Sequence, residues 1–213
     1  MHYATPIQTN ADPLPQASPI PQHARVALGI GSNLGDPQQQ ILQGLQALDR
    51  HAGIAIAKLS PFFWTAPVYQ HAPPPVPHPP YLNGAAILDT ELAPQALMRV
   101  CLDVEASLGR VRHAGWTPRP LDLDILLWER QQFDLPVRGC EPAVTVPHPR
   151  MSDRAFVLIP LSHIAPHWRF PQRSLPSDPN ILELARAASS AGIELDRPVD
   201  LALPESARPI HHV

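Results

Sequence analysis

The spacing of apolar residues along the chain predicts a series of short strands and amphipathic helices. Alternation of apolar with other residues predicts strands over residues 25–30 and 81–88, and a mostly apolar run predicts one strand over residues 54–65. Apolar residues three or four positions apart predict helices over residues 37–51 and 93–109. The predicted order for the first half is therefore strand, helix, strand, strand, helix.

The second half is predicted to add a strand, a turn region and two helices. Residues 121–128 are apolar except for Asp122 and Asp124, and we expect them to form a strand. A turn with a short strand is predicted over residues 129–140, and a helix is predicted after the V-P-H-P sequence. A last amphipathic helix is predicted over residues 178–191. This order predicts an α+β fold, a ferredoxin-like antiparallel sheet packed by helices in a single domain.

Proline-rich stretches mark the expected edges of that domain. Residues 1–24 contain five prolines, and we expect a flexible N-terminal arm there. One domain is predicted over residues 25–192, followed by a loose C-terminal tail over residues 193–213. Seven prolines in residues 67–80 exclude a helix or a central strand, so a long loop is predicted inside the domain.

Composition excludes some classes of function. The formal net charge of −3 lacks the excess of cations that is typical of nucleic-acid or membrane-surface binding. The chain has no apolar run of about 18 residues, and its N-terminus is polar. Cys101 and Cys140 lack metal-ligand spacing and favour a reduced compartment. We therefore expect a cytoplasmic protein with no nucleic-acid or membrane partner.

Candidate chemistry concentrates in residues 110–128. Alternation along a strand places the carboxylates of Asp122 and Asp124 on one face, where they repel each other unless a cation compensates. Carboxylate oxygens suit Mg²⁺, and an arginine-rich loop just upstream suits phosphate oxygens. Together they predict a nucleotide phosphoryl-transfer site. Two solvated acids beside a solvated loop are the simpler alternative.

Other polar and glycine residues allow two interpretations each. Gly29, Gly31 and Gly35 differ by one residue from the spacing of a dinucleotide fingerprint, and a tight turn into a helix explains most of them. Glu105, near a helix C-terminus, would bond a backbone group or orient an arginine, or would be a solvated charge. His148, taken alone, is more often a structural turn residue.

Five motifs occur in an order that resembles a known family. They are G-S-N-L-G-D-P at residues 31–37, Y-L-N-G-A at 81–85, L-G-R-V-R at 108–112, W-x-P-R-x-L-D-L-D-I-L at 116–126 and V-P-H-P at 146–149. Together they resemble 6-hydroxymethyl-7,8-dihydropterin pyrophosphokinase of folate biosynthesis, over about residues 25–166. The R-x-L-D-L-D-I block is the most specific of them.

The resemblance implies a reaction and a catalytic set. ATP would donate its β,γ-pyrophosphate to the hydroxymethyl group of the pterin, and AMP would leave. Asp122 and Asp124 match the acids that hold two Mg²⁺ ions in the family. Arg110 and Arg119 match cations of a mobile loop that stabilise charge on the phosphates. These four residues form the expected catalytic set.

The resemblance also implies two sets of binding residues. The expected ATP contacts are Glu105, Arg110, Arg112, Trp116, Arg119, His148 and Arg154. The expected pterin contacts are Thr65, Ala66, Tyr81, Asn83 and Phe156. Tyr81 and Phe156 match an aromatic pair that sandwiches the ring, although without the resemblance both would be assigned to the core. The sequence departs from the family pattern at Gly115, Thr117 and Pro149.

Two other functions stay open beside the pyrophosphokinase. A nucleotidyltransferase uses a similar D-x-D pair of metal ligands, but a G-S pair usually stands close ahead of its acids, and here Gly31-Ser32 lies far upstream. A non-catalytic module that binds pterin would not require the acids and the main arginines. The expected partners are ATP and the pterin, with no obligatory protein partner.

Overall fold

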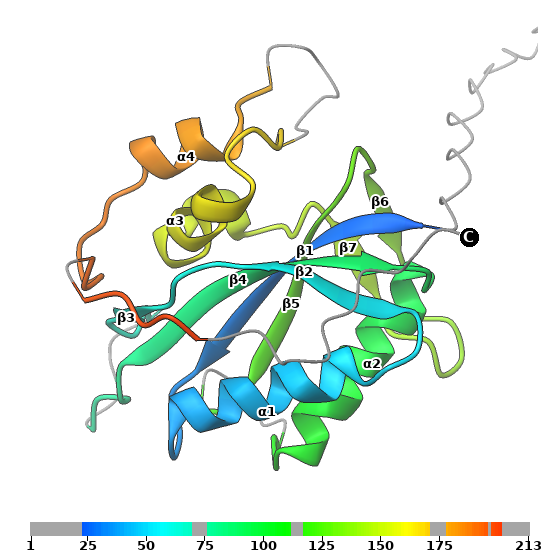
Figure 1. Cartoon of the computed structure of the whole chain (residues 1–213), viewed down its shortest axis with the longest axis horizontal. Coiled ribbons are helices and arrows are strands. Elements are labelled where there is room, and N and C mark those ends of the chain that lie inside the picture. The colour runs from blue at the N-terminus through cyan, green and yellow to red at the C-terminus, as the bar shows by residue number, and fades with distance from the viewer. Residues whose placement is uncertain (1–22, 70–75, 112–116, 171–177, 196, 202–213) are drawn as a thin grey trace, which may run out of the picture.

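The computed structural model describes residues 23–69, 76–111, 117–170, 178–195 and 197–201. The prediction of a flexible N-terminal arm therefore lies outside the described residues. Within them, one antiparallel sheet with helices on both faces confirms the predicted α+β fold (Figure 1). The domain boundaries drawn from the sequence stay a prediction.

The sheet consists of five strands. They are β1 (Ala24–Ser32), β2 (Ile54–Leu59), β3 (Phe63–Thr65), β4 (Tyr81–Thr90) and β5 (Asp122–Trp128). Their order is β2-β4-β1-β5, with β3 also paired to β4. Where the sequence predicts one strand over residues 54–65, the structure has two. The break falls at Ser60 and Pro61, where the Ser60 hydroxyl accepts a hydrogen bond from the Ala85 N–H and proline has no N–H to donate.

Two helices cover each face of the sheet, as Figure 1 shows. On one face lie α1 (Pro37–Asp49) and α2 (Pro94–Ser107), and on the other lie α3 (Ala155–Ile164) and α4 (Ile181–Ala187). A separate core of buried apolar residues fills each of the two interfaces. Asp36 is the N-cap of α1, because its carboxylate accepts hydrogen bonds from the N–H groups of Gln38 and Gln39.

A small hairpin completes the fold after β5. It pairs β6 (Phe133–Leu135) with β7 (Val144–Val146), and a 3₁₀ turn, η1 (Met151–Asp153), precedes α3. Trp128, at the end of β5, meets the ring of Phe133 edge-on with 5.8 Å between the ring centroids. The hairpin therefore packs onto the same core as α1 and α2.

The C-terminal part differs from its prediction in two ways. The last helix begins at Ile181, later than predicted, because Asn180 and Glu183 form a capping box around its first turn. The tail beyond residue 192 is not loose where the structure describes it. Val199 exchanges two backbone hydrogen bonds with Phe62, and the Glu194 N–H donates to the carbonyl of Trp64. This segment pairs backbone groups of β3 and of the preceding Phe62 that would otherwise be unpaired at the edge of the sheet.

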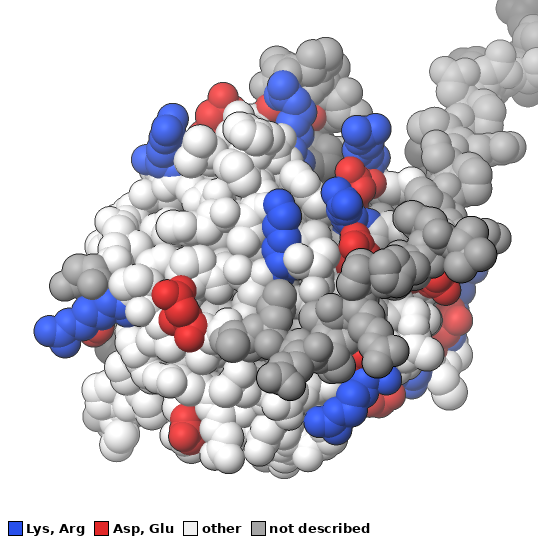
Figure 2. Space-filling model, in the orientation of Figure 1, with Lys and Arg blue, Asp and Glu red and all other residues white. Residues whose placement is uncertain are grey.

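Strand register brings the predicted site residues together. Gly31 of β1 lies opposite Asn83 of β4 on one side and opposite Asp122 of β5 on the other. Residues two apart share a face, so Gly29, Tyr81 and Asp124 lie on the same face of the sheet, toward α3. Charged side chains elsewhere are dispersed, and Figure 2 shows scattered charges of both signs separated by broad uncharged areas on one face.

Candidate active site

A cavity of about 370 Å³ lies on this face of the sheet, between the strands and the start of α3. It is lined by these predicted site residues: Thr65, Ala66, Tyr81, Asn83, Arg110, Arg119, Asp122, Asp124, Arg154 and Phe156. Glu105 and His148 lie behind its wall, and Arg112 and Trp116 lie outside the described residues. The predicted residues that line the cavity come from strands β3, β4 and β5, from three connecting segments and from the start of α3.

Glycines make the floor of the cavity flat. A Cβ atom on Gly31 would lie 2.5 Å from Asn83 Oδ1, and one on Gly29 would lie 3.2 Å from a methyl carbon of Leu126. Neither glycine has a positive φ, whereas Gly35, with φ of +70°, does serve the turn into α1. The interpretation of these glycines as turn residues is therefore right for Gly35 and wrong for Gly29 and Gly31, which leave room for the side chains of Leu126 and Asn83.

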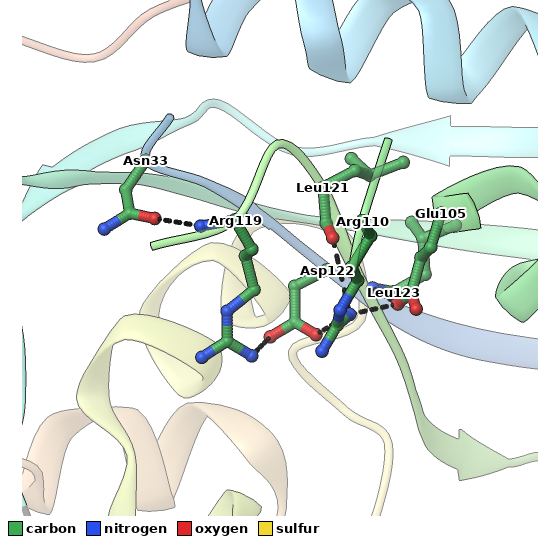
Figure 3. A network of polar contacts seen from close by, with 7 residues as sticks. All are labelled: Asn33, Glu105, Arg110, Arg119, Leu121, Asp122 and Leu123. Atoms are coloured by element: carbon green, nitrogen blue, oxygen red, sulfur yellow. Dashed lines mark hydrogen bonds and ion pairs between the residues drawn. The ribbon is translucent and has the colours of Figure 1, made fainter. Parts of the chain in front are cut away.

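Asp122 holds two arginines at once, as Figure 3 shows. Its Oδ1 lies 2.5 Å from Nη1 of Arg110, and its Oδ2 lies 3.0 Å from Nη1 of Arg119. Arg110 Nη1 also lies 2.5 Å from Oε1 of Glu105 and donates to the carbonyl of Leu121 at 3.3 Å. Ion pairs with acidic residues therefore hold both arginines in place at the cavity. Each guanidinium keeps further N–H donors for an anion.

Asp124 is the acid of the pair whose charged form the surroundings disfavour. Burial and, after it, the neighbouring carboxylate of Asp122 raise the pKa of Asp124 to about 7, against the opposing effects of Arg154 and Arg110. A divalent cation at the two carboxylates would relieve this repulsion, and oxygen donors are those that Mg²⁺ prefers. No cluster of three or more potential ligands occurs in the described ranges, so a metal here needs further oxygens from a substrate.

Cations gather on the opposite wall. Arg154 lies with its guanidinium carbon 5.6 Å from the centroid of the Phe156 ring, and burial together with the positive charge of Arg150 lowers its pKa. Arg150 also lines the cavity, and the sequence analysis missed it. Its position two residues after His148 was the available signal. Two arginines that repel each other beside a cavity favour a polyanionic ligand between them.

His148 is a neutral turn residue in this structure. Burial, with the charges of Arg154 and Arg150, lowers its pKa to about 4. Its Nδ1 accepts a hydrogen bond from the backbone N–H of Arg150 at 3.2 Å. The backbone N–H of His148 donates to the carbonyl of Leu126. His148 therefore shapes the backbone that carries Arg150, and its predicted contact with ATP stays a prediction.

The other end of the cavity suits a flat polar ring. Tyr81 and Phe156 both line it and neither is fully buried, although Phe156 also packs against the core on the α3 face. The Asn83 side-chain amide donates to Oγ1 of Thr65 at 2.7 Å, which fixes its orientation in a buried place. The guanidinium of Arg119 lies 5.9 Å from the centroid of the Tyr81 ring. The aromatic end therefore adjoins the arginine and acid end directly.

Glu105 is buried and resolves the alternatives left open by the sequence. Only 2% of its side chain is exposed, and its Oε1 accepts a hydrogen bond from the Leu123 N–H at 2.8 Å. The same oxygen pairs with Arg110. Glu105 thus both bonds a backbone group and orients an arginine, while its predicted direct contact with ATP stays a prediction.

This double role predicts unequal effects of two substitutions at Glu105. We expect Glu105→Leu to lower the free energy of unfolding by about 3 kcal/mol, because it leaves the Leu123 N–H and the Arg110 guanidinium without their buried acceptor. Glu105→Gln keeps an acceptor oxygen, so its loss should be smaller by about half. Urea unfolding of both variants measures this, and equal losses would contradict it.

Fold and site together define an enzyme of phosphoryl-type transfer, with acids for a metal, cations for phosphates and an aromatic slot for a flat acceptor. A model of the family "7,8-dihydro-6-hydroxymethylpterin-pyrophosphokinase (HPPK)" matches residues 27–166. The chain belongs to this family.

Relatives support the assignment over most of the chain. A 2-amino-4-hydroxy-6-hydroxymethyldihydropteridine pyrophosphokinase of Pseudomonas aeruginosa is 41% identical over 171 residues, which is 80% of this chain and 95% of that protein. The enzyme of the same name from Methylorubrum extorquens is 37% identical over 142 residues, covering 67% of this chain and 83% of the relative.

Solved structures with the same fold are longer than this chain. A Plasmodium falciparum HPPK-DHPS triple mutant superposes with a TM-score of 0.61 and 12% identity, over 81% of this chain and 45% of that one. The wild-type protein gives a TM-score of 0.59, also at 12% identity, over 78% of this chain and 44% of that one. The chain thus spans less than half of these proteins, and they support the fold alone. In the described part of the chain, no helix is both long enough and apolar enough to span a membrane.

Proposed function

We propose that the cavity on the α3 face of the sheet is where this pyrophosphokinase transfers the β,γ-pyrophosphoryl group of ATP to the hydroxymethyl group of 6-hydroxymethyl-7,8-dihydropterin. The observation that carries the proposal is the adjacency of its two ends at Gly31, with Asn83 on one side and Asp122 on the other. An acceptor held at the aromatic end would present its substituent to phosphates held at the other. Proximity of this kind supplies much of the catalysis in phosphoryl transfer.

Asp122 and Asp124 would hold two Mg²⁺ ions at the phosphate end. The strand carries both carboxylates on one face, and the raised pKa of Asp124 indicates that a cation is favoured there. Bound metal would neutralise the triphosphate and promote ionisation of the acceptor hydroxyl. The protein supplies fixed carboxylates and a partly buried setting in which these charges act strongly.

Arginines on both walls would hold the triphosphate. Arg110 and Arg119 approach from the side of Asp122, while Arg154 and the newly recognised Arg150 approach from the start of α3. Their guanidinium groups would stabilise the charge that develops as the bond to AMP breaks. Arg112 and Trp116 lie outside the described residues, and their contacts with ATP stay predictions.

The pterin would lie between the rings of Tyr81 and Phe156. Its amide edge would meet Asn83, with the Thr65 hydroxyl and the backbone of Ala66 completing that edge. The bond to Thr65 engages one of the two N–H donors of Asn83 Nδ2, so its second N–H and its Oδ1 remain to pair with the amide edge of the ring. A location in the cytoplasm, the two-ion count and the absence of nucleic-acid, membrane and obligatory protein partners stay predictions.

A product assay tests the proposal most directly. Purified protein is mixed with Mg²⁺, ATP and the hydroxymethyldihydropterin, and AMP, ADP and free pyrophosphate are resolved. We expect AMP to form in step with a pyrophosphorylated pterin. Free pyrophosphate would instead indicate nucleotidyl transfer, and pterin binding without turnover would indicate a binding module.

A further inference from the structure

Asn33 makes more contacts than its place at the end of β1 requires. Its side chain Oδ1 accepts a hydrogen bond from the Arg119 N–H at 2.8 Å, and its Nδ2 donates to the Pro79 carbonyl at 3.2 Å. Its backbone N–H also donates to the carbonyl of Arg119 at 3.1 Å. Only 2% of the residue is exposed, and it does not line the cavity. Figure 3 shows the bond from Asn33 to the Arg119 backbone.

The two segments that Asn33 joins carry residues from opposite ends of the cavity. Arg119 pairs with Asp122 at the phosphate end. Pro79 stands two residues before Tyr81, the first residue of β4 and part of the aromatic end. The guanidinium of Arg119 and the ring of Tyr81 lie 5.9 Å apart. One buried amide therefore holds the backbone at Arg119 and the backbone just before Tyr81. The side chains of these two residues lie at the two ends of the cavity.

We propose that Asn33 is a positioning residue that fixes Arg119 relative to the pterin slot, so that the phosphates and the acceptor are aligned. The inference rests on the proposed function of the cavity. Asn33 acts through Arg119 and through the segment before Tyr81, because its own amide is buried and engaged. A merely structural residue at this place would stabilise the turn without linking the kinetic roles of the two segments.

Two substitutions separate the side-chain bond of Asn33 to the Arg119 segment from its bond to the Pro79 segment. An amide has one acceptor and one donor group, and both are used here. Asn33→Asp keeps the acceptor for the Arg119 N–H but replaces the donor with an oxygen that repels the Pro79 carbonyl. Asn33→Ala removes both side-chain hydrogen bonds. The matched control is Asn180→Asp, since Asn180 also accepts from a backbone N–H but lies at the start of α4.

Steady-state kinetics with these variants test the link. For Asn33→Asp we expect KM for the pterin to rise about fivefold, the loss of roughly one hydrogen bond, with kcat and KM for ATP changed less than about twofold. For Asn33→Ala we expect kcat to fall about tenfold or more, because the Arg119 N–H loses its side-chain acceptor and only the backbone bond between the two residues remains. Asn180→Asp should leave all three unchanged. If Asn33→Asp affects both substrates equally, or neither, the proposal is overturned.

A double substitution distinguishes positioning from general stability. If Asn33 acts through Arg119, then Asn33→Ala should reduce kcat far less in an Arg119→Gln background than in the unmodified protein. Additive losses would overturn the proposal.

Hydrogen exchange gives a readout independent of activity. The Arg119 N–H should be protected in the unmodified protein and exchange at least about fivefold faster in Asn33→Ala, since it loses a hydrogen bond. Unchanged exchange would overturn the positioning role even in an active enzyme. Faster exchange in a chain without pyrophosphokinase activity would instead reject the proposed function while leaving the contact itself established.

Discussion

Replacement of Asp124 by asparagine is expected to stop pyrophosphoryl transfer and at the same time to stabilise the folded chain. The catalytic loss follows from the proposed metal site, since an amide is a weaker and uncharged ligand for Mg²⁺. Charge stabilisation by a metal is worth several kcal/mol, so kcat should fall by more than about a hundredfold. Pterin binding should persist, because Asp124 is not part of the aromatic end.

The gain in stability follows from the raised pKa of Asp124. Burial and the neighbouring Asp122 carboxylate raise that pKa from 3.8 to about 7, so above pH 7 the folded state carries a charge that its surroundings disfavour. The full difference corresponds to about 4 kcal/mol, and we expect roughly half to be recovered because the amide still requires solvation. The gain should be present at pH 8 without metal, decline as the pH falls through 7, and vanish near pH 4.

Asp122→Asn provides the contrast within the same pair. It should remove activity just as completely, but it should destabilise the protein because Arg110 and Arg119 lose their shared partner. Thermal unfolding with EDTA at pH 8 should therefore move the two melting temperatures in opposite directions. Asp89→Asn, which breaks an exposed pair with Arg25, is the surface control and should change little.

One outcome would contradict the electrostatic account of Asp124. If Asp124→Asn lowers the melting temperature at pH 8 as Asp122→Asn does, then the Asp124 carboxylate is compensated in the metal-free protein. The pKa of Asp124 would then not be raised. If Asp124→Asn remains active, the assignment of a metal to this residue is wrong whatever its stability.

Periodic patterns predicted those parts of the fold and site that repeat along one element. Alternation over residues 121–128 correctly placed Asp122 and Asp124 on one face, opposite the buried Leu123 and Ile125. Spacing of apolar residues likewise gave both long helices to within about two residues. In these elements the local pattern and the tertiary packing demand the same arrangement.

Features that depend on distant partners could not be predicted in this way. The break at Ser60 is fixed by its bond to Ala85, and the pairing of Val199 is fixed by a strand far away in sequence. Arg150 belongs to the site only because the turn before α3 faces β5. Asn33 was not among the predicted site residues, because its side-chain partners are backbone groups of two loops. Such contacts exist only once the sheet has formed.

Replacement of Arg119 by glutamine should also cause a large loss of activity. Arg119 reaches the cavity from Asp122, and the carboxylate there, with Tyr81, holds its pKa above the ordinary value against the effect of burial. It therefore carries a full positive charge at every pH of interest. The Nε–H of this guanidinium is buried without a partner among the described residues.

The size and the character of the loss follow from that charge. Removing one fixed donor from a site of developing charge reduces kcat by about 10²–10³-fold, and we expect this range for Arg119→Gln. Pterin affinity should fall only about twofold, because the cation near the Tyr81 ring contributes roughly 0.5 kcal/mol. The matched control is Arg25→Gln, since Arg25 also pairs with an aspartate at 3.2 Å but on the exposed surface. Single-turnover rates with saturating ATP, together with equilibrium titration of the pterin, separate the two effects. A variant that loses pterin affinity and keeps its rate would move Arg119 from the phosphate end of the cavity to the pterin end.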